Sequence, residues 1–258
     1  MRRQLEPLIL GRRVVQAWGH ESVKFASAVE AVGVRIDGVA RRGKYLLAPL
    51  DDGRELVVHL GMTGQLRLRP GDIDPYVRAW WTLDDGHVLE LRDVRRFGRV
   101  GVVPAGQYAS LPTLASLGPE PWDSELDDGG LWRRLRPSRI RVKTQLLSQR
   151  PIAGVGNIYA DEALWRAGVH PGRRSVTRVE SQRLLVALRE VLEQGIANGG
   201  TTLRDYRDVR GSAGRNQLEL GCYGRAGKPC PRCGAELRRS LVDGRGTTHC
   251  PTCQPAGR

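Results

Sequence analysis

The 258-residue sequence lacks the features of a membrane or secreted protein. No apolar run approaches the roughly 20 residues that span a bilayer, and the mean hydropathy is −0.39. The start, Met1-Arg2-Arg3, does not show the apolar core of a signal peptide. We therefore expect a cytoplasmic protein that has no membrane partner.

Acidic residues are scarce relative to basic ones. Lys and Arg number 41 against 28 Asp and Glu, which gives a formal net charge of +13. The surplus is spread along the chain in arginine pairs, such as Arg12-Arg13, Arg95-Arg96 and Arg238-Arg239. A distributed surplus is typical of a surface that follows a nucleic-acid backbone. A ribosome-bound or simply very soluble protein is the alternative.

Cysteine is also rare, with five in the chain, but four of them form two Cys-x-x-Cys pairs. Sixteen residues separate the pair Cys230 and Cys233 from the pair Cys250 and Cys253. In a reducing compartment this spacing predicts four thiolates around one zinc ion. Because all four ligands come from the protein, the site is closed and structural, and the metal supplies much of the module's folding energy. We expect Cys222 to be an ordinary buried thiol.

The rest of the sequence divides by periodicity into a β part and a helical part. A first helix around residues 5–9 ends at Gly11. From about residue 30 to 104 the pattern predicts strands, and the Asp-Gly turns at 51–53 and 84–86 predict hairpins of a sandwich or barrel. Beyond Leu117–Pro121 the pattern is helical, with a candidate capping box at Thr177 and Glu180.

Three loop motifs carry candidate functional groups. His59–Gly64 and Asp93–Gly98 place the wedge-like side chains of Met62 and Phe97 beside glycine and arginine. An enzyme that extracts a base from a duplex must fill the vacated gap with such side chains. Gly154–Tyr159 opens a helix whose free N–H groups suit a phosphate. Singly, each motif has an ordinary alternative: core residues for the first two, and a tight turn between helices for the third.

Taken together, the ordered motifs resemble the zinc-finger type of the formamidopyrimidine-DNA glycosylase family. The resemblance runs nearly end to end, through Arg2–Gly11, Arg42–Leu47, His59–Gly64, Asp93–Gly98, Leu117–Pro121, Gly154–Glu162, Gly199–Leu203, Tyr223–Arg225 and the zinc knuckles. It implies an α+β, multidomain fold with DNA in a cleft between two lobes. The implied parts are an N-terminal β-sandwich with flanking helices (1–118), a helical helix–two-turn–helix domain (119–221) and a C-terminal β-hairpin zinc finger (222–258).

The resemblance also implies a base-excision-repair activity on damaged double-stranded DNA. The family removes oxidised purines, namely 8-oxoguanine and formamidopyrimidines, and nicks the strand by β,δ-elimination as a monomer. Met62, Arg95 and Phe97 match the trio that fills the hole and contacts the estranged base. His59 belongs to the same DNA-binding loop.

The remaining family residues also carry over one by one. Asn157 and Arg245 match the phosphate clamp around the lesion, and Arg245 also assists δ-elimination. Lys44 matches the loop lysine of β-elimination and phosphate contact, and Lys143 matches a further DNA-contacting lysine. Without these motifs, the two lysines would be read as solvated surface charges.

The sequence departs from the family at its N-terminus. The family begins, after removal of the initiator Met, with Pro-Glu: the proline amine attacks the sugar C1′ to form a Schiff base, and the glutamate acts as acid. Here the chain opens at Met1, roughly eight residues later, and Glu6 is no substitute. One explanation is a true start farther upstream, which an uncapped first helix favours. The other is a truncated relative that binds damaged or abasic DNA with impaired catalysis, where Lys44 supplies a weak amine.

A second departure concerns Tyr76-Val77-Arg78, where the family usually shows histidines that contact DNA. We assign neither Tyr76 nor Arg78 a role from the sequence. The base-reading loop at about residues 207–216 carries no readable code, so the preferred lesion is not predicted.

Overall fold

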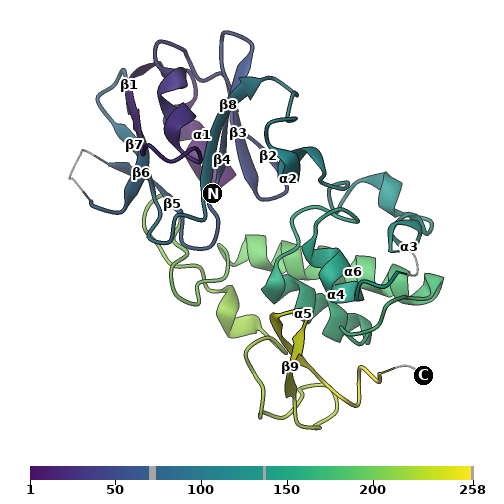
Figure 1. Ribbon diagram of the computed structural model, residues 1–258. Coiled ribbons are helices and arrows are strands. Elements are labelled where there is room, and N and C mark those ends of the chain that lie inside the picture. The colour runs from purple at the N-terminus through teal and green to yellow at the C-terminus, as the bar shows by residue number, and fades with distance from the viewer. Residues whose placement is uncertain (70–73, 136–137, 257–258) are drawn as a thin grey trace. The chain divides into compact units, whose positions relative to one another are not determined.

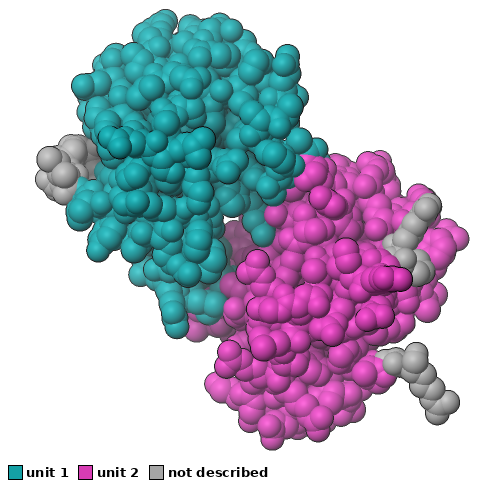
Figure 2. Space-filling model, in the orientation of Figure 1, with its two compact units in different colours: residues 1–115, 199–215 teal, residues 116–198, 216–258 magenta. Residues whose placement is uncertain are grey.

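The computed structural model describes residues 1–69, 74–135 and 138–256, drawn as a coloured ribbon in Figure 1. The chain forms two compact units, shown in different colours in Figure 2. Unit 1 comprises Met1–Ala115 and Gly199–Arg215, and unit 2 comprises Ser116–Asn198 and Asn216–Arg258. The domain limits 1–118, 119–221 and 222–258 stay a prediction, and the last two residues of the third lie outside the described residues.

Unit 1 is built on two antiparallel sheets of four strands each (Figure 1). One sheet has the order β1-β6-β7-β5, from β1 (Val14–Gly19), β5 (Gln65–Arg69), β6 (Val77–Leu83) and β7 (Val88–Arg92). The other has the order β2-β3-β4-β8, from β2 (Ala40–Arg42), β3 (Tyr45–Pro49), β4 (Arg54–His59) and β8 (Arg99–Pro104). Both predicted hairpins are confirmed, as the β3–β4 and β6–β7 turns, where Gly53 and Gly86 adopt φ of 82° and 83°.

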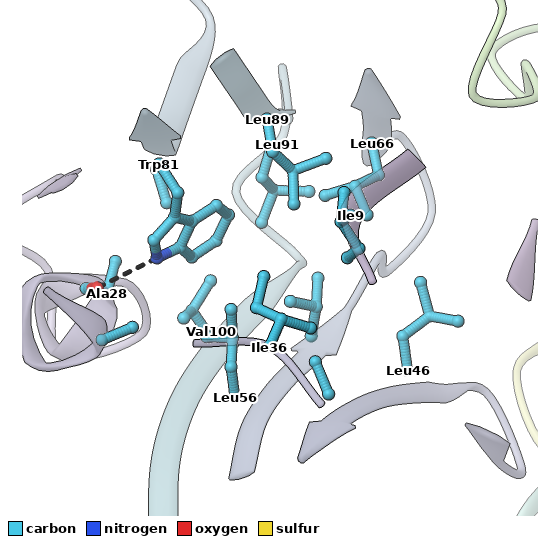
Figure 3. Close-up of a cluster of buried hydrophobic side chains, with 14 of the residues drawn as sticks. Ile9, Ala28, Ile36, Leu46, Leu56, Leu66, Trp81, Leu89, Leu91 and Val100 are labelled. Atoms are coloured by element: carbon cyan, nitrogen blue, oxygen red, sulfur yellow. Dashed lines mark hydrogen bonds between the residues drawn. The ribbon is translucent and has the colours of Figure 1, made fainter. Parts of the chain in front are cut away.

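The two sheets of unit 1 share one apolar core, which confirms the predicted sandwich (Figure 3). Trp81 of β6 is fully buried at its centre, and its indole N–H donates to the carbonyl of Ala28 at 3.0 Å. Ala28 belongs to the 3₁₀ helix η1 (Ala26–Ala31). Many of the other core side chains come from both sheets and from helix α1 (Arg2–Ile9), among them Leu5, Ile9, Leu46, Leu56, Val58, Leu66, Leu83, Leu89, Leu91 and Val100. Burial of these apolar surfaces is the main term that stabilises the unit.

Residues 199–215 complete unit 1 although they follow the long helix of unit 2 in sequence. Val209 joins the sandwich core, and the Gln4 side-chain amide donates to Asp208 at 2.9 Å. A short helix, α2 (Pro112–Ala115), ends the first stretch of the unit.

Unit 2 is helical, with a small C-terminal sheet (Figure 1). Its helices are η2 (Ser124–Leu126), α3 (Gly130–Arg134), α4 (Val142–Leu147), α5 (Asn157–Ala167), α6 (Arg178–Ala197) and η3 (Asn216–Glu219), followed by strands β9 (Arg238–Val242) and β10 (Arg245–His249). The predicted capping box is confirmed at the start of α6, where Thr177 and Glu180 exchange hydrogen bonds of 3.2 and 2.7 Å. No helix in the described ranges is long and apolar enough to cross a membrane.

Candidate nucleic-acid interface and metal centre

Five of the predicted site residues gather at one end of the sheet β2-β3-β4-β8 in unit 1. Tyr45 at the start of β3 pairs with His59 at the end of β4, which pairs with Arg99 at the start of β8. Because neighbouring strands are antiparallel, the turn before β3, the loop after β4 and the loop before β8 meet at this end of the sheet. These three segments carry Lys44, His59, Met62, Arg95 and Phe97.

A single buried carboxylate joins the two loops that flank β4 and β8. Asp93 has no exposed surface. Its Oδ1 accepts the Thr63 hydroxyl at 2.5 Å, and its Oδ2 accepts the Gly98 backbone N–H at 2.6 Å. The Thr63 oxygen in turn accepts the backbone N–H of Arg95 at 3.2 Å. Charge-assisted bonds of this kind are about twice as strong as neutral ones, so the loops are held as one rigid element.

The rigid loops present large side chains to solvent. Met62 is 64% exposed and Phe97 is 45% exposed, so neither is a core residue. The Arg95 guanidinium carbon lies 4.7 Å from the centre of the Phe97 ring, within cation–π range. Gly61 has φ of 65°, and a Cβ there would lie 2.5 Å from the Phe97 carbonyl carbon, so close approach of the loops requires glycine.

His59 is half-buried beneath these loops. Its ring packs on Tyr45 with centroids 4.6 Å apart. Burial, together with the positive charges of Lys44 and Arg99, lowers the pKa of His59 to about 4. The neutral ring accepts the Gly61 N–H at Nδ1 (3.3 Å), which leaves its proton on Nε2 as a hydrogen-bond donor.

In unit 2, Asn157 contacts the strand that Arg245 begins. Arg245 starts β10 directly after the turn Asp243-Gly244, whose φ values of 47° and 76° fit a two-residue hairpin with both central residues left-handed. Asn157 is the first residue of α5, and its Nδ2 donates to the Gly246 carbonyl at 3.1 Å. Its Oδ1 is buried and has no hydrogen-bond partner in the part of the chain that the structure describes. A bound group would complete this incomplete polar site.

Lys143 lies inside unit 2, with no exposed surface. Its Nζ is 2.6 Å from Asp161 Oδ1 and donates to the Gly246 carbonyl (3.0 Å) and the Thr247 hydroxyl (2.8 Å). Burial lowers the pKa of Lys143 and raises that of Asp161 to about 6, while the attraction between the two charges opposes both shifts. The ammonium therefore fixes the strand that follows Arg245, and the DNA contact expected of Lys143 stays a prediction.

Sequence reasoning missed two acidic residues of α5 that organise the zinc module. Asp161 also accepts the Thr248 N–H at 2.9 Å. Glu162, 1% exposed, accepts the backbone N–H groups of residues 221, 222 and 223 at 3.0, 2.8 and 2.7 Å. The available signal was that two adjacent acids stand between the apolar residues Ala160 and Ala163–Trp165 of the helix, because a buried charge requires a partner.

The four paired cysteines form the predicted metal centre. The Sγ atoms of Cys230, Cys233, Cys250 and Cys253 all lie within 4.8 Å of one another. Two of the separations are 4.0 Å (230–253) and 3.5 Å (233–250). Zinc–sulfur bonds of about 2.3 Å in a tetrahedron place sulfurs about 3.8 Å apart, so the donor set fits one zinc ion. Cys222 stands apart, as predicted: it is fully buried, its thiol donates to the Thr248 carbonyl at 3.2 Å, and burial raises its pKa.

The chain matches three family models. The formamidopyrimidine-DNA glycosylase N-terminal domain matches residues 1–100, and the formamidopyrimidine-DNA glycosylase H2TH domain matches residues 117–207. The zinc finger found in FPG and IleRS matches residues 227–256.

Curated proteins and solved structures agree with these matches. The chain is 47% identical to a formamidopyrimidine-DNA glycosylase of Thermus thermophilus, over 99% of this chain and 96% of that protein. It is 44% identical to the protein of the same name from Thermomicrobium roseum, again over 99% and 96%. The crystal structure of MutM (Fpg) from T. thermophilus superposes with a TM-score of 0.91 at 46% identity, covering 100% of this chain and 97% of that chain. The Lactococcus lactis Fpg in complex with DNA that contains an abasic site gives 0.89 at 33% identity, covering 98% and 96%.

Proposed function

This chain belongs to the formamidopyrimidine-DNA glycosylase family, and from that membership we propose that it excises oxidised purines from duplex DNA. It is a base-excision DNA glycosylase with AP lyase activity of the family's kind. The proposed substrates are 8-oxoguanine and ring-opened formamidopyrimidines, and the proposed strand cleavage is β,δ-elimination. The relatives do not favour the alternative of a binding protein without catalysis, because proteins aligned over 99% of the chain are named as glycosylases.

The observation that carries the proposal is the rigid pair of loops held by Asp93. Extracting a base costs a few kcal/mol of lost stacking and pairing. Met62 and Phe97 are exposed on loops that lose little freedom when they enter the duplex, so stacking them into the gap offsets this cost. Arg95, next to the Phe97 ring, is proposed to contact the base left unpaired on the opposite strand.

Phosphate contacts are proposed for both units. In unit 1, Lys44 and the Nε2 proton of His59 face the phosphates near the lesion, and Lys44 also assists β-elimination. In unit 2, Asn157 and Arg245 clamp a phosphate, and Arg245 assists δ-elimination. Lys143 is assigned a positioning role, because its buried ammonium holds the backbone next to Arg245.

The test is to trap the covalent intermediate of the lyase reaction. An amine attacks C1′ of the lesion nucleotide, the base leaves, and the resulting imine is reduced by sodium borohydride to a stable protein–DNA adduct. We would mix the 258-residue chain with duplex DNA that carries one 8-oxoguanine or one abasic site, reduce it, and look for the adduct. Parallel samples would contain the Lys44→Ala variant and the same chain extended upstream by the family's Pro-Glu segment.

The samples discriminate between the sources of the amine. Trapping by the extended chain alone assigns the nucleophile to the α-amino group of the Pro-Glu segment. Trapping by the 258-residue chain that disappears in Lys44→Ala assigns it to Lys44. Absence of the adduct in every sample, with lesion binding intact, would overturn the proposed chemistry.

We further propose that the enzyme acts as a monomer in the cytoplasm, associated with the nucleoid. The net charge of +13 favours retention on DNA, and DNA complexes are known for the L. lactis Fpg. Sedimentation of the free chain and of its complex with a short duplex tests the monomer.

A further inference from the structure

A cavity of about 240 Å³ lies beside the Phe97 loop in unit 1. Its walls include Lys24, Tyr45, His59, Phe97, Arg99 and Thr113. None of the residues that line it is acidic. We call it the Arg99 cavity; of the residues that line it, the proposed function gives roles to His59 and Phe97 and none to Arg99.

Arg99 is the residue that points to a ligand. Its side chain is half-buried, yet among the described residues its guanidinium has neither an ion pair nor a hydrogen bond. Comparable half-buried arginines of unit 1 are paired: Arg67 lies 3.1 Å from Asp74, and Arg92 lies 2.7 Å from the same carboxylate. Because removing an unpaired cation from water costs free energy, an unpaired guanidinium facing a cavity indicates a missing anion.

The electrostatic field around the cavity is positive. Lys24 lines it and donates to the Arg96 carbonyl at 2.9 Å. Burial is the largest cause that lowers the pKa of His59, and the positive charges of Lys44 and Arg99 are the next largest. The acidic group that opposes them is Asp93, whose oxygens already accept hydrogen bonds from the loops. An anion in the cavity would meet little competing negative charge.

The neutral groups of the cavity are hydrogen-bond donors of the right kind. His59 keeps a proton on Nε2, and the hydroxyls of Tyr45 and Thr113 are hydrogen-bonded to each other on the same wall. A guanidinium fork combined with hydroxyl and imidazole donors is the set that recognises phosphate oxygens.

We propose that the Arg99 cavity binds a phosphate group, supplied by the backbone of the duplex that the Phe97 loop enters. The assignment of DNA as the source rests on the proposed function. The proposal adds Arg99 to the phosphate contacts proposed above for Lys44 and His59 in the same unit. A free phosphate or nucleotide shares this chemistry and is the alternative source.

The first arm of the test measures the salt dependence of DNA binding. Arg99→Gln is compared with Arg54→Gln, which removes the same charge from the opposite end of the β4–β8 pair, where Arg54 lies beside Pro104. Each phosphate contact contributes nearly one unit to the slope of log affinity against log salt. For a duplex with an abasic-site analogue, we expect Arg99→Gln to lower the slope by about 1 and the affinity about 10-fold.

The control variant Arg54→Gln should change the affinity less than about twofold. Arg99→Lys should keep the slope while weakening binding, because the charge remains without the fork.

The second arm uses inorganic phosphate and does not depend on DNA repair. Phosphate, added against chloride at equal ionic strength, should shift the His59 ring resonances in the wild-type chain and in Arg54→Gln, but not in Arg99→Gln. If inorganic phosphate shifts the His59 resonances but Arg99→Gln leaves the salt dependence of DNA binding unchanged, DNA is not the source of the phosphate. If phosphate leaves the wild-type His59 resonances unchanged and Arg99→Gln leaves the salt slope unchanged, the cavity is not a phosphate site. If the wild-type chain binds lesion DNA no better than undamaged DNA, the proposed function is contradicted. The experiment with inorganic phosphate then tests the cavity by itself.

Discussion

The buried pair of Lys143 and Asp161 shows how one residue acts on another through the backbone. Both side chains are without exposed surface, and between them they hold residues 246–248 behind Arg245. Breaking a buried pair by removing one partner leaves an uncompensated charge. Asp161→Asn should therefore lower the free energy of unfolding by about 3–5 kcal/mol, measured by denaturant titration of the zinc-loaded protein.

A double variant separates charge from packing at this pair. Lys143→Met combined with Asp161→Leu removes both charges and should recover part of the stability, because no unpaired ion remains. It should nevertheless bind lesion DNA more weakly than the wild type, since Gly246 and Thr247 lose their lysine partner. Wild-type affinity in the double variant would contradict the positioning role of Lys143.

His59 gives a pH dependence whose sign follows from its burial. The folded state lowers its pKa from 6.5 to about 4, so the unfolded chain takes up the proton first as the pH falls. The stability that neutral His59 contributes is complete above pH 6.5 and is lost progressively towards pH 4. His59→Gln should flatten the unfolding free energy against pH in that window, with His87→Gln in the exposed β6–β7 turn as the control. An unchanged slope in His59→Gln would contradict this account.

At the scale of elements, local chemistry predicted the turns and helix ends well. The Asp-Gly turns and the capping box of α6 are each specified by a few adjacent residues. The two loops that bear Met62 and Phe97 were also found from sequence, because glycine and wedge side chains stand next to each other. Each of these signals acts over a range of about four residues.

The rest depends on contacts between distant segments. Nothing near Asp93 in the sequence indicates that it joins Thr63 to Gly98, and nothing in residues 199–215 indicates that Val209 enters the sandwich core. Strand β1 was also missed, since its burial pattern shows one buried residue followed by exposed or half-buried ones. Such features depend on the fold as a whole, which outweighs local preference.

The zinc module is the element whose stability depends most on its ligand. Its apolar cluster is small: besides four cysteine side chains it contains Trp165, Leu237 and Ala235. Removing zinc with a chelator should unfold β9 and β10 and release Gly246, the residue after Arg245, from Asn157. Lesion binding should then fall at least about 10-fold. Hydrogen exchange should show lost protection at residues 238–249 and retained protection in β3–β8. Cys222→Ser leaves the four ligands intact and should keep its zinc. Full DNA affinity after complete metal removal would contradict this dependence.

At the scale of the whole molecule, charge and wedge residues contribute different parts of DNA recognition. The 41 basic residues attract the phosphates of any duplex, whether damaged or not, and salt weakens this attraction. Preference for a lesion requires a contribution to the binding free energy that arises only when a base is extracted from the duplex. In this chain that contribution is assigned to Met62, Arg95 and Phe97, which are three side chains on loops held by one carboxylate.

Removing the three together should therefore separate preference from affinity. Met62→Ala, Arg95→Ala and Phe97→Ala in one chain should lower binding to lesion DNA by at least about 100-fold, because three gap-filling contacts worth roughly 1 kcal/mol or more each are lost. Binding to undamaged duplex should fall less than about 10-fold, since one positive charge of many is removed.

The matched control replaces Val23, Val29 and Arg35 by alanine: two exposed apolar residues and one exposed arginine of the same unit. It removes the same charge and similar apolar surface, and should keep the ratio of lesion to undamaged affinity. Competition between the two duplexes at fixed salt measures that ratio directly. If the control and the wedge variant lost preference equally, recognition would reside in the overall charge, and the role of the Asp93-linked loops would be refuted.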